Sequence, residues 1–83
     1  MEILDFYADW CGPCQMMKPT MEAFSKMHPE IKVMAVNIDD EEERAEEFGV
    51  STIPCIVLMK DGKEVKRAVG VQSLKKLNKM LED

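Results

Sequence analysis

The chain has 83 residues, of which 46% are hydrophobic and 33% charged, a mixture typical of a globular domain rather than a disordered chain. Its net charge of −5 is concentrated locally, because seven of the sixteen acidic residues lie between Asp39 and Glu47. The sequence has no basic patch that would attract phosphate groups, so we expect no nucleic-acid partner. The longest apolar run, residues 53–59, is far shorter than the ~20 residues that span a bilayer, so we expect no membrane segment.

The length predicts one domain, residues 1–83, with one hydrophobic core. The N-terminus has no basic start, no long apolar segment and no small-residue cleavage site, which indicates no secretion signal and a cytoplasmic location. Three cysteines cannot all pair within one chain, and cytoplasmic thiols are normally reduced. We therefore expect no framework of structural disulfides.

The first half of the chain predicts a strand, a helix and a second strand. Residues 3–8 are apolar on both alternating faces except at Asp5, as in a central strand covered by helices on both sides. From Pro13 the apolar positions recur at helical spacing and end before His28, and residues 31–38 again follow a strand pattern. Two strands joined by a helix indicate a parallel pair.

The second half predicts a helix, a hairpin and a final helix. An acidic helix over residues 39–48 should end at Gly49. Strands at 56–60 and 64–69 flank Asp61-Gly62, a dipeptide typical of hairpin turns, and Ser73 should cap the last helix. The order β-α-β-α-β-β-α predicts an α/β fold with a four-stranded mixed sheet and helices on both faces.

The most informative segment is Trp10-Cys11-Gly12-Pro13-Cys14, which lies where the first strand ends and the first helix begins. The free N–H groups of a helix start stabilise a thiolate, so Cys11 is the predicted nucleophile. Cys14 follows within the first helical turn and is the predicted resolving thiol. Pro13 suits a helix start, and Gly12 leaves room for a partner chain near the sulfur.

The same cysteine spacing also supplies half of many zinc sites. A zinc site needs further ligands, and the chain offers only Cys55, His28 and scattered carboxylates. We therefore expect no metal.

Several segments together resemble the thioredoxin family. Residues 4–14, LDFYADWCGPC, are similar to its active-site segment, and residues 49–54, GVSTIP, resemble its loop with a cis-proline opposite the cysteines. Asp61-Gly62 and Val69-Gly70 match its terminal hairpin. The chain is identified as a short member with a minimal core, which implies reduction of protein disulfides by dithiol exchange.

The resemblance also implies roles for individual residues and partners. Trp10, Gly12, Pro13, Ile53 and Pro54 would form an apolar surface that holds the substrate chain beside its disulfide. The partners would be disulfide-containing proteins and a flavoenzyme similar to thioredoxin reductase. The chain itself would need no bound cofactor.

Asp5 stands in the middle of the two-sided apolar strand. Such a carboxylate is costly to bury unless it is paired or protonated, so its pKa should be raised. The resemblance implies that Asp5 accepts the proton of Cys14. The alternative is an aspartate satisfied by backbone groups at a strand end.

The chain departs from the family pattern in three respects. Family members usually carry another strand and helix before the position where residue 1 stands, so we expect an exposed sheet edge through which a dimer could form. The expected form is nevertheless a monomer, with the dimer as the alternative. Ala35 stands where a lysine is common, and Cys55 where a threonine is usual. Cys55 is interpreted as a small buried hydrophobe, the alternative being a redox-sensitive or metal-binding thiol.

Two other functions stay open from the sequence alone. One is a glutaredoxin-like reductase that depends on glutathione. The other is a non-catalytic binding module, or a metal or iron-sulfur carrier that uses Cys11, Cys14 and Cys55.

Overall fold

The computed structural model describes residues 1–82 and has the predicted order of strands and helices. The elements are β1 (Glu2–Tyr7), α1 (Gly12–Met27), β2 (Lys32–Asn37), α2 (Glu42–Glu47), β3 (Cys55–Lys60), β4 (Lys63–Val69) and α3 (Leu74–Met80).

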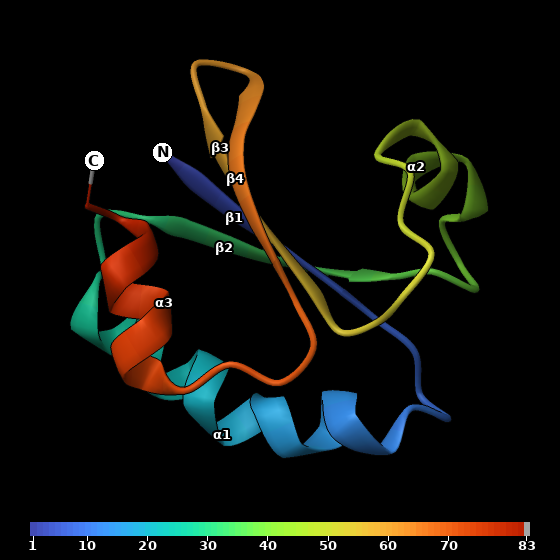
Figure 1. Cartoon of the computed structure of the whole chain (residues 1–83), viewed down its shortest axis with the longest axis horizontal. Coiled ribbons are helices and arrows are strands. Elements are labelled where there is room, and N and C mark those ends of the chain that lie inside the picture. The colour runs from blue at the N-terminus through green and yellow to red at the C-terminus, as the bar shows by residue number, and fades with distance from the viewer. Residues whose placement is uncertain (83) are drawn as a thin grey trace.

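The four strands form one mixed sheet in the order β2-β1-β3-β4. Strand β1 pairs in parallel with β2 and antiparallel with β3, and β3 continues antiparallel to β4. Helices α1 and α3 cover one face of the sheet and α2 covers the other (Figure 1). The fold is therefore the predicted four-stranded α/β core, with β2 at one edge of the sheet.

Alternating side chains of β1 supply both faces of the sheet. Ile3 packs with Met17, Phe24 and Leu77 in the cluster under α1 and α3. Leu4 and Phe6 join the cluster on the α2 side. Burying each side chain of this size stabilises the fold by roughly 1.5–3 kcal/mol, so a central strand apolar on both faces holds the two layers together.

Helix α2 begins at Glu42 rather than at Asp39, so the predicted start was wrong by three residues. The Asn37 carbonyl accepts hydrogen bonds from the backbone N–H groups of Asp40 and Glu41, and its side chain accepts one from the N–H of Asp39. These bonds fold the segment into a turn that competes with the helix. Gly49 ends the helix as predicted, with a φ of 63°.

The other predicted boundaries are correct within one residue. Asp61 and Gly62 both have positive φ, 54° and 77°, as a tight two-residue hairpin turn requires. The Ser73 hydroxyl accepts a hydrogen bond from the N–H of Lys76 at 3.2 Å and so caps α3. No helix within residues 1–82 combines the length and apolar character that crossing a membrane requires.

Candidate active site

Cys11 and Cys14 form a disulfide at the N-terminus of α1, with their Cα atoms 5.2 Å apart. Cys11 is the N-cap residue of this 16-residue helix, and its Sγ accepts a hydrogen bond from the Cys14 N–H at 3.2 Å. A helix N-terminus favours negative charge on the capping atom. In the reduced protein, the same contact would stabilise a thiolate on Cys11.

The two sulfurs differ in their neighbours rather than in their exposure. Cys11 is 5% exposed and Cys14 is 4% exposed. The Cys11 Sγ lies 4.0 Å from the carbonyl oxygen of Ile53, whereas Cys14 lines a cavity that also contains Asp5. Cys14 thus faces the cavity that contains Asp5, and Cys11 faces the loop before β3.

The loop before β3 brings Ile53 and Pro54 to the disulfide, and it approaches the start of α1 in Figure 1. The peptide bond between these two residues is cis, an isomer that the sequence alone left open. Pro54 is buried, and its carbonyl accepts a hydrogen bond from the Gly70 N–H at 2.8 Å. The hairpin end therefore holds the loop against the cysteine pair.

The segment around the cysteines presents an open surface. Trp10 is 70% exposed, and its indole Nε1 donates a hydrogen bond to Asp39 Oδ2 at 2.9 Å. A Cβ atom at Gly12 would meet nothing within 4 Å, so the space above this backbone is free. Pro13 is exposed beside it. Trp10, Gly12 and Pro13 thus adjoin the two cysteines along the chain, and Ile53 packs against the cysteine pair.

Asp39 contacts the residue beside Cys11, and the sequence interpretation missed it because its acidic segment predicts only a helix. A signal for it was available. Trp10 and Asp39 each follow one strand of a parallel pair, and the carboxyl ends of such strands meet at the same edge of the sheet.

Asp5 lies in β1 behind the cysteine pair and is half-buried. Its Oδ1 atom is fully buried and has no hydrogen-bond partner within the described part of the chain. Burial raises the pKa of Asp5 from 3.8 to about 6. The raised pKa agrees with the prediction, and an orphaned oxygen argues against the alternative of an aspartate satisfied by backbone groups.

Cys55 belongs to a different environment. It is 1% exposed and packs with Leu4, Phe6 and Val57 on the α2 side of the sheet. Burial raises the pKa of the Cys55 thiol, and Arg67 partly opposes this effect. Cys11 and Cys14 form a separate cluster, so the packing supports the interpretation of Cys55 as a buried hydrophobe rather than a third site thiol.

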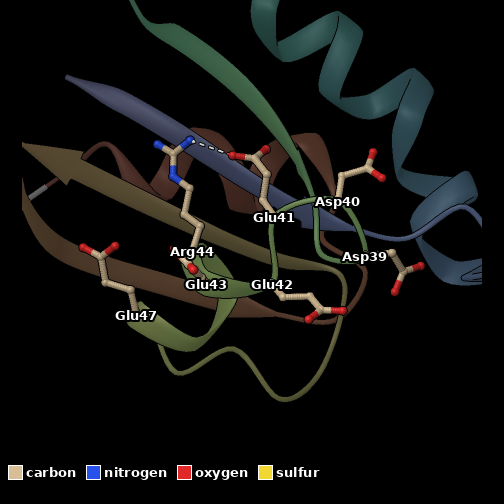
Figure 2. Close-up of a pocket in the computed structure, with 7 residues that line it drawn as sticks. All are labelled: Asp39, Asp40, Glu41, Glu42, Glu43, Arg44 and Glu47. Atoms are coloured by element: carbon tan, nitrogen blue, oxygen red, sulfur yellow. Dashed lines mark ion pairs between the residues drawn. The ribbon is translucent and has the colours of Figure 1, made fainter.

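A hollow of about 520 Å³ lies over the acidic segment, and neither cysteine of the disulfide lines it. Figure 2 shows that its carboxylates point in different directions, and that Arg44 pairs with Glu41 at 3.5 Å. Within residues 1–82 no group of three or more His, Cys, Asp or Glu side chains could hold a metal ion.

The comparisons with known proteins agree with this geometry. The family model described as Thioredoxin matches residues 1–83. The chain is 44% identical over 79 residues to thioredoxin from Chlamydia muridarum, covering 95% of this chain and 78% of that protein. These findings favour the thioredoxin interpretation over the glutaredoxin-like alternative.

Solved structures give the same result. The oxidized form of mitochondrial thioredoxin 3 from Saccharomyces cerevisiae superposes with a TM-score of 0.91 at 33% identity, covering 99% of this chain and 76% of that one. Thioredoxin from Fasciola hepatica superposes with a TM-score of 0.90 at 40% identity, covering 96% and 76%. The chain belongs to the thioredoxin family of thiol-disulfide oxidoreductases, whose partners are disulfide-containing proteins and a reductase.

Proposed function

We propose that Cys11 is the attacking thiol and Cys14 the resolving thiol in the reduction of protein disulfides. The observation that carries this assignment is the helix N-cap position of the Cys11 sulfur, with the Cys14 N–H at 3.2 Å. The Cys11 thiolate attacks one substrate sulfur, the substrate disulfide breaks, and the other substrate sulfur leaves as a thiolate. Cys14 then attacks the Cys11 sulfur, the protein disulfide forms, and the remaining substrate sulfur leaves with the electron pair.

Asp5 is the proposed acceptor of the Cys14 proton. Both residues line the same cavity, and the carboxyl has a pKa of about 6 because of burial. An acceptor with a pKa near the working pH is ionised often enough to take a proton and neutral often enough to release it. The Cys14 thiol becomes a nucleophile as its proton moves to the Asp5 carboxylate.

The proposed substrate surface consists of Trp10, Gly12, Pro13, Ile53 and Pro54. The free space above Gly12 and the exposed indole of Trp10 support it. A substrate chain bound in extended form could pair with the backbone of Ile53 beside the Cys11 sulfur. The apolar side chains would contribute contact area, and the backbone would set the register of the bound chain.

Further parts of the proposal concern the state of the protein. We expect residues 1–83 to act as one domain, because both core clusters pack on a single sheet. The electron donor is proposed to be a flavoenzyme similar to thioredoxin reductase. The working form is proposed to be a cytoplasmic monomer, with pairing of two copies through the β2 edge as the alternative.

A trapping experiment tests the order of the two thiols. In Cys14→Ser the attack by Cys11 proceeds but the mixed disulfide is not resolved, so covalent adducts with substrate proteins accumulate. In Cys11→Ser no adduct forms. Non-reducing electrophoresis and peptide mass spectrometry read out both variants, and adducts on Cys14 in place of Cys11 would overturn the assignment.

A further inference from the structure

A cavity of about 320 Å³ lies between α1 and the sheet, behind the cysteine pair. It is lined by Asp5, Tyr7, Asp9, Cys14, Lys18, Met21, Glu22, Ser25, Val33 and Ala35. Asp5 pairs in register with Ala35 across β1 and β2. Because the alanine side chain is short, the β2 wall leaves space next to the carboxyl.

The charged and titratable side chains that line this cavity come from β1, from the segment that follows it and from α1. Strand β1 and the residue positions after it contribute Asp5, Tyr7 and Asp9, and α1 contributes Lys18 and Glu22. Strand β2 contributes Val33 and Ala35, which carry no charge. The Cys55 thiol of β3 does not line the cavity, although the charge of Asp5 contributes to raising the pKa of Cys55. Lys18 is the one cation among the residues that line the cavity.

We propose that Lys18 is a positioning residue, which reaches into the cavity from α1 and keeps the Asp5 carboxyl ionised before Cys14 is deprotonated. The proposal rests on the function proposed above for Asp5. The two residues of β2 that line the cavity, Val33 and Ala35, carry no charge and cannot supply a cation there, so the cation comes from α1.

The physical reason is the uncompensated oxygen of Asp5. Oδ1 is fully buried and accepts no hydrogen bond from the described residues, so no hydrogen bond to this oxygen stabilises the ionised carboxyl. An ammonium group on a long flexible stem can approach through the cavity while its carbons stay against apolar surface. A cation there favours the ionised carboxyl.

Glu22 competes for the same cation. It lies one helical turn after Lys18 on α1 and lines the same cavity, so the ammonium group can pair with Glu22 or approach Asp5. When the Cys14 proton moves to Asp5, the carboxyl becomes neutral and Lys18 is free to return to Glu22. The proton then leaves Asp5 to water through the cavity, and no other reactant is needed.

The test compares Lys18→Met with Lys26→Met. Both remove an exposed cation from α1, but Lys26 does not line the cavity. Two quantities are measured in each variant: the carboxyl titration of Asp5 by carbon-13 NMR in the oxidised protein, and the pH profile of insulin reduction.

In Lys18→Met we expect the Asp5 titration and the acid limb of the rate profile to move to higher pH by about half a pH unit, the size of one partly screened charge. With a pKa that moves from about 6 to about half a unit higher, the rate at pH 6 should fall about twofold and the rate at pH 7 by about a sixth, with no change at high pH where Asp5 is fully ionised. Lys26→Met should leave both curves unchanged.

A second pair of variants separates charge from packing. Lys18→Arg keeps the cation and should retain both curves. Adding Ala35→Lys to Lys18→Met supplies a cation from the opposite wall and should move both curves back. Glu22→Gln removes the competitor and a negative charge, so it should move the Asp5 titration to lower pH.

An unchanged Asp5 titration in Lys18→Met would overturn the proposal, as would an equal change in Lys26→Met. The role of Asp5 itself is tested separately by the rate of Asp5→Asn. If that rate were unchanged, the proposed proton transfer would fail, whereas the NMR titration would still report whether Lys18 controls the charge of Asp5.

Discussion

The start of α1 and the start of β3 both carry buried cysteines, but the two regions use them differently. Cys11 and Cys14 are 5% and 4% exposed, and Cys55 is 1% exposed. Cys11 caps a helix and contacts the loop before β3, under a surface that is open at Gly12. Cys55 lies in a strand that is paired on both sides and packs against Leu4 and Phe6.

The difference shows that exposure alone does not identify a reactive thiol. A helix N-terminus supplies N–H groups and a favourable potential for a thiolate, and a second cysteine three residues later supplies the resolving sulfur. The Cys55 environment is apolar and disfavours the thiolate, as its raised pKa indicates. The position of a cysteine in the backbone, at a helix start or within a paired strand, therefore decides whether its thiol is reactive or only packs in the core.

The largest expected effect is at Cys11. We expect Cys11→Ser to reduce insulin at the uncatalysed rate, because serine lacks the nucleophilic sulfur. The fold should remain intact, since the hydroxyl can still cap α1. Turbidity of insulin in the presence of dithiothreitol measures the rate. Activity retained in this variant would show that Cys11 is not the catalytic thiol that distinguishes the start of α1 from the start of β3.

The next effect is at Asp5, which lies between the regions. Asp5→Asn should slow reduction about tenfold at pH 7 if the carboxylate takes the Cys14 proton. If the double variant Asp5→Asn, Cys55→Ala reduces insulin at the same rate as Asp5→Asn alone, Cys55 has no part in the loss of activity. A normal rate in Asp5→Asn would refute the role in catalysis.

Asp5→Asn should also raise stability in a pH-dependent way. The folded-state pKa of about 6 exceeds the ordinary 3.8, so the native state holds its proton longer than the unfolded chain, and stability falls as pH rises between these values. Above pH 6 the variant should gain about 2–3 kcal/mol in the free energy of unfolding, and below pH 3.8 almost nothing. Urea unfolding at a series of pH values measures the difference, and a gain largest at acid pH would contradict it.

Cys55→Ala should lower the free energy of unfolding by about 1 kcal/mol because it leaves a small cavity in the core. Insulin reduction should change by less than about twofold, as expected of a residue outside the site. Mass spectrometry of peptides after mild peroxide treatment of the native protein should find the Cys11 to Cys14 bond and no bond to Cys55. A disulfide that includes Cys55 would contradict the assignment of Cys55 to a separate, unreactive environment.

The smallest effect concerns the indole anchor. Asp39→Ala removes the 2.9 Å acceptor of the Trp10 N–H, and an exposed hydrogen bond of this kind contributes about 0.5 kcal/mol. We expect about a twofold loss in kcat/KM for a protein substrate and a more mobile indole by fluorescence anisotropy. Asp39→Asn keeps an acceptor oxygen but loses the negative charge, so it serves as the control. Equal losses in both variants would show that the charge of Asp39, and not its hydrogen bond to Trp10, supports activity.

Much of the fold could be predicted from local patterns. The apolar alternation of residues 3–8, the helical spacing after Pro13 and the Asp61-Gly62 turn each match an element within one residue. The start of α2 could not be predicted from its acidic composition, because Asn37 offers the next residues a competing turn. Helix propensity is weak beside such hydrogen bonds.

The candidate site was predictable in part. The residues from Trp10 to Cys14 adjoin one another in sequence, and the helix start that surrounds them follows from Pro13 and the strand before it. The placement of Ile53 beside Cys11 and of Asp39 beside Trp10 depends on contacts over 42 and 29 residues. No local pattern encodes these distances, although the family resemblance pointed to the first.

By itself, the sequence determined where the thiols stand, which residues form the strands and, apart from the start of α2, the helices, and that a carboxylate would be buried in the central strand. Only the tertiary structure decided that Cys55 packs away from the cysteine pair, that Asp39 anchors Trp10, and that Lys18 shares a cavity with Asp5. The reason is physical. Secondary structure follows from the nearest neighbours along the chain, whereas the charge and reactivity of a buried group depend on atoms that packing brings from other elements.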